Sequence, residues 1–105
     1  RLMDAAILDA IDTERRCQDD RWGHQRHDPL KWGMILAEEA GEVAKAALDW
    51  HEEQSVEVWA AHRYRVRSEL IQVAAVCVAW LEHLAEQQVD AQIREQHWRP
   101  EPGSV

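Results

Sequence analysis

The sequence is poor in the residues that break helices, because its 105 residues include only four Gly and three Pro. Two of the prolines, Pro100 and Pro102, lie close to the C-terminus, so nearly all of the chain before them is free to be helical. The turn chemistry that separates short β-strands is missing as well. We therefore predict one all-α domain over residues 1–92, a bundle of about four helices completed by oligomerisation, followed by a C-terminal tail over residues 93–105.

Cysteine is also scarce: Cys17 and Cys77 are the only two, and no Cys-x-x-Cys spacing occurs. Neither a cysteine zinc site nor a disulfide framework is therefore indicated. The six histidines form no HxxxH, HExxH or ExxH pattern, so a zinc protease and a di-iron bundle are not supported either. We expect both cysteines to be buried thiols in a reducing cytoplasm.

Basic residues are outnumbered, with 12 Lys and Arg against 20 Asp and Glu and a net charge of −8. This argues against a nucleic-acid polymer as partner, because binding one requires clustered cations that neutralise phosphates. The longest nearly apolar segment, residues 70–81, falls short of the ~20 residues that span a bilayer, so we expect no membrane partner and a cytoplasmic location. That segment is apolar on nearly all sides, which predicts a homo-oligomer, most simply a twofold dimer.

Helical segments are predicted over residues 2–20 and 29–53, and, after a turn or break around Gln54 and Ser55, up to about residue 92, the last as one helix or two. Asp28 followed by Pro29 is typical of a helix start, with the aspartate as cap and the proline in the first turn. On the second segment an apolar stripe is expected to pack against the bundle: Leu30, Met34, Ala37, Gly41, Ala44 and Leu48.

Three carboxylates, Glu38, Glu39 and Glu42, lie inside an otherwise apolar stretch of the second segment, residues 35–46. At about 100° per residue, Glu39 lies within about 60° of Glu42, and Glu38 within about 40° of it. Two carboxylates about 5 Å apart repel by about 3 kcal/mol at an effective dielectric constant of about 20. Such a cluster suits a hard cation, above all Mg²⁺, with Mn²⁺ able to substitute. The alternative is a solvated helix face supported by Lys45.

Glu69 and Gln72 repeat the three-residue spacing of Glu39 and Glu42 at the start of the later apolar segment. Polar groups in apolar surroundings are costly without partners. The two pairs therefore either hydrogen-bond to each other or share a metal ion, and spacing alone leaves both open.

The acidic motifs, in this order, resemble those of the MazG-like all-α nucleoside triphosphate pyrophosphohydrolases, which include dimeric dUTPases and dCTP pyrophosphatases. The family signature is Glu-Glu-x-x-Glu on one helix, matched by Glu38, Glu39 and Glu42, and Glu-x-x-Asp on a later one, where Glu69 matches the start. The segment before them is similar to the dCTP-cleaving branch, with its tryptophan and His-x-Pro step: Trp22, His27, Asp28 and Pro29. The resemblance covers about residues 19–82.

The resemblance implies Mg²⁺-dependent hydrolysis of a (deoxy)nucleoside triphosphate to the monophosphate and pyrophosphate, as in nucleotide-pool house-cleaning. It also implies a dimer or a tetramer. By carry-over the metal ligands are Glu39, Glu42, Glu69 and Gln72, and the catalytic carboxylates are Glu38 and Glu39. Glu38 is either a further ligand or the group that positions the attacking water. Gln72 departs from the family, since it replaces the Asp of the second motif and brings no charge. A non-catalytic nucleotide- or protein-binding helical module that has lost part of the metal site is therefore the alternative.

Four residues are candidates for binding the substrate. Trp22 offers a stacking surface for a base, with core packing as its alternative, and the same choice is open for Trp32. His27 stands at the His-x-Pro step. Lys45 and Arg67 are spaced to reach a phosphate near the metal, and each is equally able to form an ordinary salt bridge.

Overall fold

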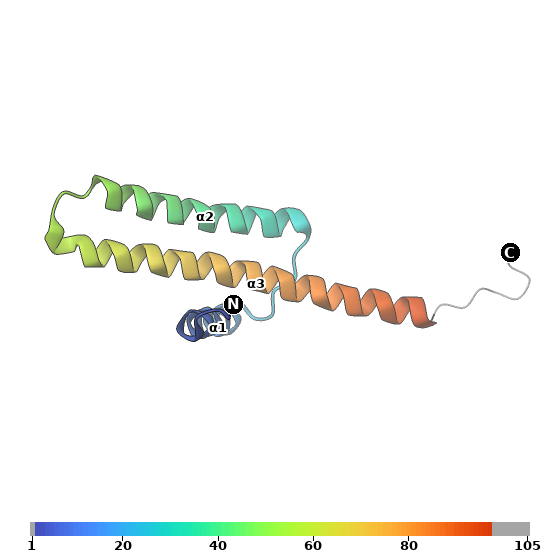
Figure 1. The fold of residues 1–105 in the computed structure, drawn as a ribbon. Helices are drawn as coiled ribbons and strands as arrows, with labels where there is room; N and C mark the ends of the chain where they lie inside the picture. Colours follow the sequence, from blue (N-terminus) through green and yellow to red (C-terminus); the bar gives the residue numbers. More distant parts are fainter. Residues whose placement is uncertain (1, 98–105) are drawn as a thin grey trace, which may run out of the picture.

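The computed structural model describes residues 2–97, which form three α-helices and contain no strand (Figure 1). Helix α1 covers Ala5–Trp22 and α2 covers Pro29–Glu52; a short 3₁₀ turn, η1, at Val56–Val58 leads into α3, which covers Trp59–His97. The all-α class is confirmed. Within the described residues three helices replace the expected four, because the third predicted segment is one helix of 39 residues.

Helix α3 runs on through residues 93–97, which the sequence had assigned to the tail. The remaining tail residues, including Trp98, Pro100 and Pro102, lie outside the described part of the chain. No proline or glycine stands between residues 59 and 97, so nothing in the local sequence ends the helix earlier.

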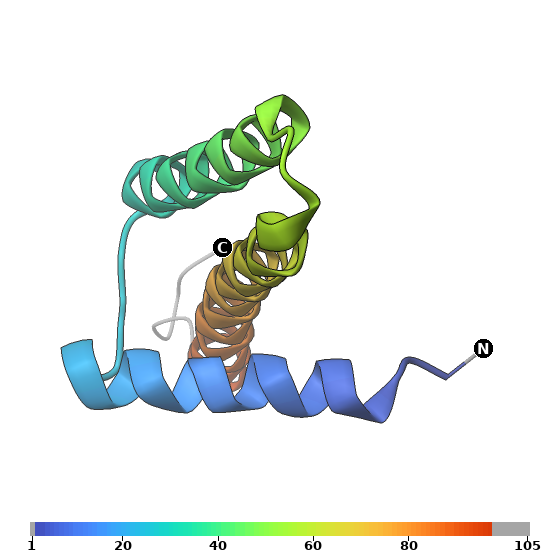
Figure 2. The same cartoon turned by 90° about the vertical axis from the view of Figure 1, so that its left-hand side faces the viewer.

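Helices α2 and α3 form an antiparallel hairpin, whereas α1 crosses α3 steeply on its other side (Figures 1 and 2). α3 packs against both other helices, and no backbone contact joins α1 directly to α2. The C-terminal part of α3 extends past the beginning of α2 (Figure 1). The positions of α1 and α2 are therefore both determined by their packing against α3.

The helix ends follow from short-range capping. The Asp28 carboxylate accepts a hydrogen bond from the Lys31 N–H at 2.8 Å, and Pro29 begins α2, as predicted. Gly23 ends α1 with φ at 72°, a conformation that costs glycine little, and its N–H donates to the Asp19 carbonyl at 2.7 Å. The two caps set the length of the loop over residues 24–28.

The core centres on Trp32, which is 1% exposed and packs with Val76 and Ala79. Its indole N–H donates to His83 Nδ1 at 2.9 Å, and its ring lies nearly parallel to that of Trp80 with the centroids 6.1 Å apart. Trp32 is therefore a core residue that ties α2 to α3, which resolves the choice left open by the sequence.

The predicted packing stripe of α2 is on the wrong face. Leu30, Met34 and Leu48 are 74%, 61% and 53% exposed, and the small residues of the stripe, Ala37, Gly41 and Ala44, are exposed as well. The face that meets α3 carries Trp32, Ile35, Leu36, Glu39, Val43, Ala46 and Trp50. Both faces are apolar in sequence, and the bulkier one, with two tryptophans, packs inward because it removes more apolar surface from water.

The cysteines also differ from expectation, since Cys17 is exposed and Cys77 is half-buried. Cys17 occupies the outer side of α1 because Gln18 takes the buried position.

By length and composition alone, residues 56–97 include a segment apolar enough to cross a membrane, with a mean hydropathy of 1.3 and 22% of it buried. A mostly buried core helix of a soluble protein passes the same test, whereas only 22% of this segment is buried.

Candidate functional site

A cleft of about 510 Å³ opens where the end of α1, the loop over residues 24–28 and the beginning of α2 meet α3. Its floor is apolar, with Trp32, Ile35, Val76 and Ala79. Its walls carry polar, charged and aromatic side chains, among them Gln18, Trp22, His27, Lys31, Glu38 and Glu39. A concave site with an apolar floor and converging polar groups is typical of small-molecule binding.

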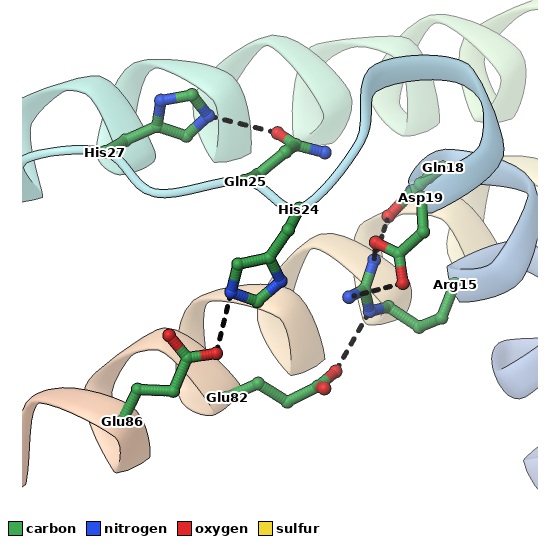
Figure 3. A network of polar contacts seen from close by, with 8 residues as sticks. All are labelled: Arg15, Gln18, Asp19, His24, Gln25, His27, Glu82 and Glu86. Atoms are coloured by element: carbon green, nitrogen blue, oxygen red, sulfur yellow. Dashed lines mark hydrogen bonds and ion pairs between the residues drawn. The ribbon is translucent and has the colours of Figure 1, made fainter. Parts of the chain in front are cut away.

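The loop that forms one wall is held on α3 through Glu86, which His24 and Arg26 both contact; Figure 3 shows the contact of His24. His24 Nε2 lies 2.7 Å from Glu86 Oε1, and Arg26 lies 3.3 Å from the other oxygen of Glu86. The hydrogen bond from His24 holds the pKa of the Glu86 carboxyl below its usual value, despite partial burial. These contacts with Glu86 hold the loop in place by polar interactions and not by apolar packing.

A second set of contacts joins α1 to α3 beside the cleft (Figure 3). The Arg15 guanidinium donates to Glu82 Oε1 at 3.1 Å and to Gln18 Oε1 at 3.3 Å, and lies 3.2 Å from the Asp19 carboxylate. Its side chain is only 11% exposed. Because solvent screening is reduced there, this cluster orients Gln18 more firmly than a surface pair would.

Glu39 is unusual among the residues of the site, because one of its carboxylate oxygens is buried and unpaired. It lies on the face of α2 turned to α3, and its Oε2 is buried without a hydrogen-bond partner. Burial raises the pKa of its carboxyl above the usual value, and the charge of Glu69 raises it further, followed by those of Glu38, Glu42 and Glu14. An unpartnered buried acceptor among like charges is a group that a cation would relieve.

The four predicted ligands do not form a ready-made metal site. Glu69 is half-buried on α3 and exerts the largest charge effect on Glu39, whereas Glu38 and Glu42 are exposed on the flank of α2. Gln72 stands one turn after Glu69 and is half-buried. Across residues 2–97, no three His, Cys, Asp or Glu side chains are positioned to hold a metal ion. The donor chemistry fits Mg²⁺, and binding would require the flanking carboxylates to turn inward.

The aromatic candidates separate into two roles. Trp22 lines the cleft, is 58% exposed and carries the Arg21 guanidinium 4.9 Å from its ring centroid. His27 also lines the cleft. Its Nε2 lies 3.0 Å from the Gln25 amide oxygen, which accepts the hydrogen bond, and its ring stands at 73° to that of Trp32 with the centroids 4.8 Å apart. Trp22 thus offers an open stacking surface, while His27 and Trp32 shape the pocket behind it.

The two predicted phosphate contacts are not brought to the cleft. Lys45 is exposed and does not line it, although its charge helps to lower the pKa of the Asp49 carboxyl, after the dominant hydrogen bond from Arg65. Arg67 lines a separate groove of about 230 Å³ between α1 and α3, with Glu14 and Tyr64. The cations that do line the cleft are Arg26 and Lys31.

Sequence reasoning missed Gln18, His24, Gln25, Arg26 and Lys31 as cleft residues. Four of these lie in the irregular loop and at the start of α2, where no periodicity assigns a direction to a side chain. The position of Gln18 could have been predicted from the sequence, because it lies one turn before Trp22 on the same face of a helix.

Comparisons with known protein families, with curated proteins and with solved structures find no match to this chain.

Proposed function

We propose that this protein is a Mg²⁺-dependent nucleoside triphosphate pyrophosphohydrolase of the MazG-like kind, which cleaves a (deoxy)nucleoside triphosphate to the monophosphate and pyrophosphate. The observation that carries the proposal is the buried, unpartnered Glu39 oxygen, surrounded by acidic charges at the edge of a cleft with an open aromatic wall. Nucleotide-pool house-cleaning in the cytoplasm would suit such an activity.

The roles of the residues follow from their positions. Glu39 and Glu69, on facing helices, would hold the ion, with Glu42 and Gln72 turning in to complete its oxygen ligands. Bound Mg²⁺, or Mn²⁺ in its place, would reverse the local negative charge and so admit a triphosphate. Glu38, at the cleft, would orient a water molecule toward the α-phosphorus and accept its proton. The bond from the α-phosphorus to the bridging oxygen breaks, and that oxygen leaves with the pyrophosphate.

The test is a pyrophosphate-release assay over the common (deoxy)nucleoside triphosphates, with Mg²⁺ and with excess chelator. We expect release of one pyrophosphate per monophosphate formed, and no release after chelation. Addition of Mn²⁺ to the chelated protein should restore turnover. Absence of release for every nucleotide, at protein concentrations that give a clear Mg²⁺-dependent thermal shift, would contradict the enzyme and favour the alternative below.

A non-catalytic binding module is the second candidate, because Gln72 stands where the family has an aspartate and the described residues contain no preassembled ligand group. One fewer anion weakens the attraction for a divalent cation. This candidate predicts that nucleotide binds and stabilises the protein without turnover, by mass action on the folded state. Replacement of Gln72 by Asp should then increase Mg²⁺ affinity and restore hydrolysis.

We further propose that a second copy of the chain covers the outer face of α2 and the uncovered side of α3. The outer face of α2 between Leu30 and Leu48 is apolar and exposed along most of the helix, and α3 exposes Leu70, Leu81 and Leu84. Monomeric proteins rarely leave so continuous an apolar surface in water. The same patch on two copies can pair about a twofold axis, as a dimer or as half of a tetramer.

Light scattering coupled to size exclusion checks this assembly. The wild type is expected to have at least twice the mass of one chain, and the double variant Met34→Glu/Leu48→Glu is expected to be monomeric, because burying two charges without partners costs several kcal/mol. Gln54→Glu, which adds a charge in an exposed turn, is the matched control and should leave the mass unchanged. A monomeric wild type, or a chain that stays in solution only with detergent, would contradict the proposal.

A further inference from the structure

Gln18 is the most deeply buried polar side chain of the cleft, at 4% exposure. It projects from α1 one turn before Trp22, so the two side chains lie on the same face of the helix, about 5–6 Å apart at their β-carbons. Both line the same cleft. A base stacked on the Trp22 ring would therefore place its edge beside the Gln18 amide.

The orientation of that amide is determined by its neighbour. Arg15 can only donate hydrogen bonds, so the Gln18 atom 3.3 Å from its guanidinium must be the carbonyl oxygen. Arg15 is itself held by Glu82 on α3 and by Asp19, and cannot easily turn away (Figure 3). The NH₂ group of Gln18 makes no hydrogen bond within residues 2–97 and is left for an occupant of the cleft. The carbonyl oxygen of Gln18 is thus engaged by Arg15, whereas its NH₂ group remains available as a donor.

A neutral amide contributes little to phosphate binding. The charged side chains of Arg26 and Lys31, which also line the cleft, bind phosphates more strongly. The amide is suited to reading the polar edge of a base. An oxo group accepts the amide N–H, whereas an amino group at the same position presents a second donor and leaves both buried donors without partners.

We propose that Gln18 is a specificity-determining residue, which donates an N–H to an oxo group on the base of a bound nucleoside triphosphate, and that Arg15 is the positioning residue that fixes the direction of its amide. The inference rests on the proposed function, because it assumes that a nucleotide fills the cleft. It predicts a preference for an oxo base over its amino counterpart.

The experiment compares kcat/KM for two matched substrate pairs, dUTP with dCTP and dITP with dATP. The wild type is expected to favour the oxo member of at least one pair about tenfold or more. Gln18→Glu keeps the size of the side chain and the contact with Arg15 but offers only acceptors. It should reduce kcat/KM for the oxo substrate by about 10- to 100-fold and shift the ratio toward the amino substrate.

Further variants separate specificity from folding. Gln18→Met, which retains the volume, should lose the ratio without reversing it, and Arg15→Met should bring the ratio toward one by freeing the amide to rotate. Arg16→Met is the matched control: Arg16 is 75% exposed and pairs with Asp12 away from the cleft, so the ratio should not change. Thermal melting of each variant shows that it is folded.

The outcomes distinguish this inference from the proposed function. Hydrolysis with a wild-type preference for the amino bases, or with a ratio that none of the Gln18 variants moves, would overturn the inference and leave the enzyme intact. Absence of both hydrolysis and Mg²⁺-dependent binding of any nucleotide would overturn both.

Discussion

Replacement of Glu39 by Gln is expected to reduce Mg²⁺-dependent pyrophosphate release by at least about 10²-fold, because a lost ligand charge removes several kcal/mol of stabilisation from the transition state. The amide keeps the shape of the side chain and removes its charge. Pyrophosphate release at saturating Mg²⁺ measures the effect. Glu52→Gln, the same change at an exposed position near the end of α2, is the matched control and should retain activity.

The same variant should stabilise the metal-free protein at neutral pH. Burial and neighbouring carboxylates raise the pKa of Glu39 in the folded chain above its value of 4.5 in the unfolded chain. Its favourable contribution is therefore complete below pH 4.5 and is lost as the pH rises through the folded pKa. Gln is neutral at every pH, so the melting temperature of Glu39→Gln should exceed that of the wild type at pH 7, and the two should converge toward pH 4.

Melting temperatures measured with added Mg²⁺ show whether the activity and the stability of Glu39→Gln have the same cause. Added Mg²⁺ should raise the melting temperature of the wild type and have little effect on Glu39→Gln, because only the carboxylate gains a partner. If Glu39→Gln melts at a higher temperature than the wild type, and Mg²⁺ does not change the melting temperature of the wild type, the acidic cluster is a purely structural feature. Full activity in Glu39→Gln would remove this residue from the metal site.

Replacement of Trp32 by Ala is expected to lower the free energy of unfolding by about 3–5 kcal/mol, because it empties the centre of the core. Trp32→Phe keeps an aromatic ring against Trp80 but leaves His83 Nδ1 without its donor, at a cost of about 1–3 kcal/mol. Denaturant titration followed by far-UV circular dichroism, at one fixed chain concentration, measures both.

Trp22→Ala is the matched control for this series, since Trp22 is 58% exposed. It should change the free energy of unfolding far less than Trp32→Ala, while weakening nucleotide binding by the loss of a stacking surface. Equal losses of stability for the two tryptophans would contradict the assignment of one to the core and the other to the cleft.

Two apolar faces of one helix show where sequence reasoning reached its limit. On α2, the stripe from Leu30 to Leu48 and the stripe from Trp32 to Trp50 both repeat with helical spacing, and the wrong one was assigned to the core. Periodicity shows that a face is apolar, but the partner helix decides which face is covered first. The exposed stripe is the surface that we propose a second copy of the chain covers.

What the amino-acid sequence determined by itself was short-range: the helical class, the start of α2 at Asp28 and Pro29, and the crowding of Glu39 among acidic neighbours. Caps and side-chain crowding act within about four residues along a helix, so no distant contact is needed to predict them. Only the tertiary structure decided that Trp32 is core, that Arg67 lies away from the cleft and that Gln18 lines it. The position of Trp32 depends on how α2 packs on α3, and the positions of Gln18 and Arg67 depend on how α1 crosses α3. Both follow from contacts between residues more than 50 positions apart, such as Trp32 with His83 and Arg15 with Glu82.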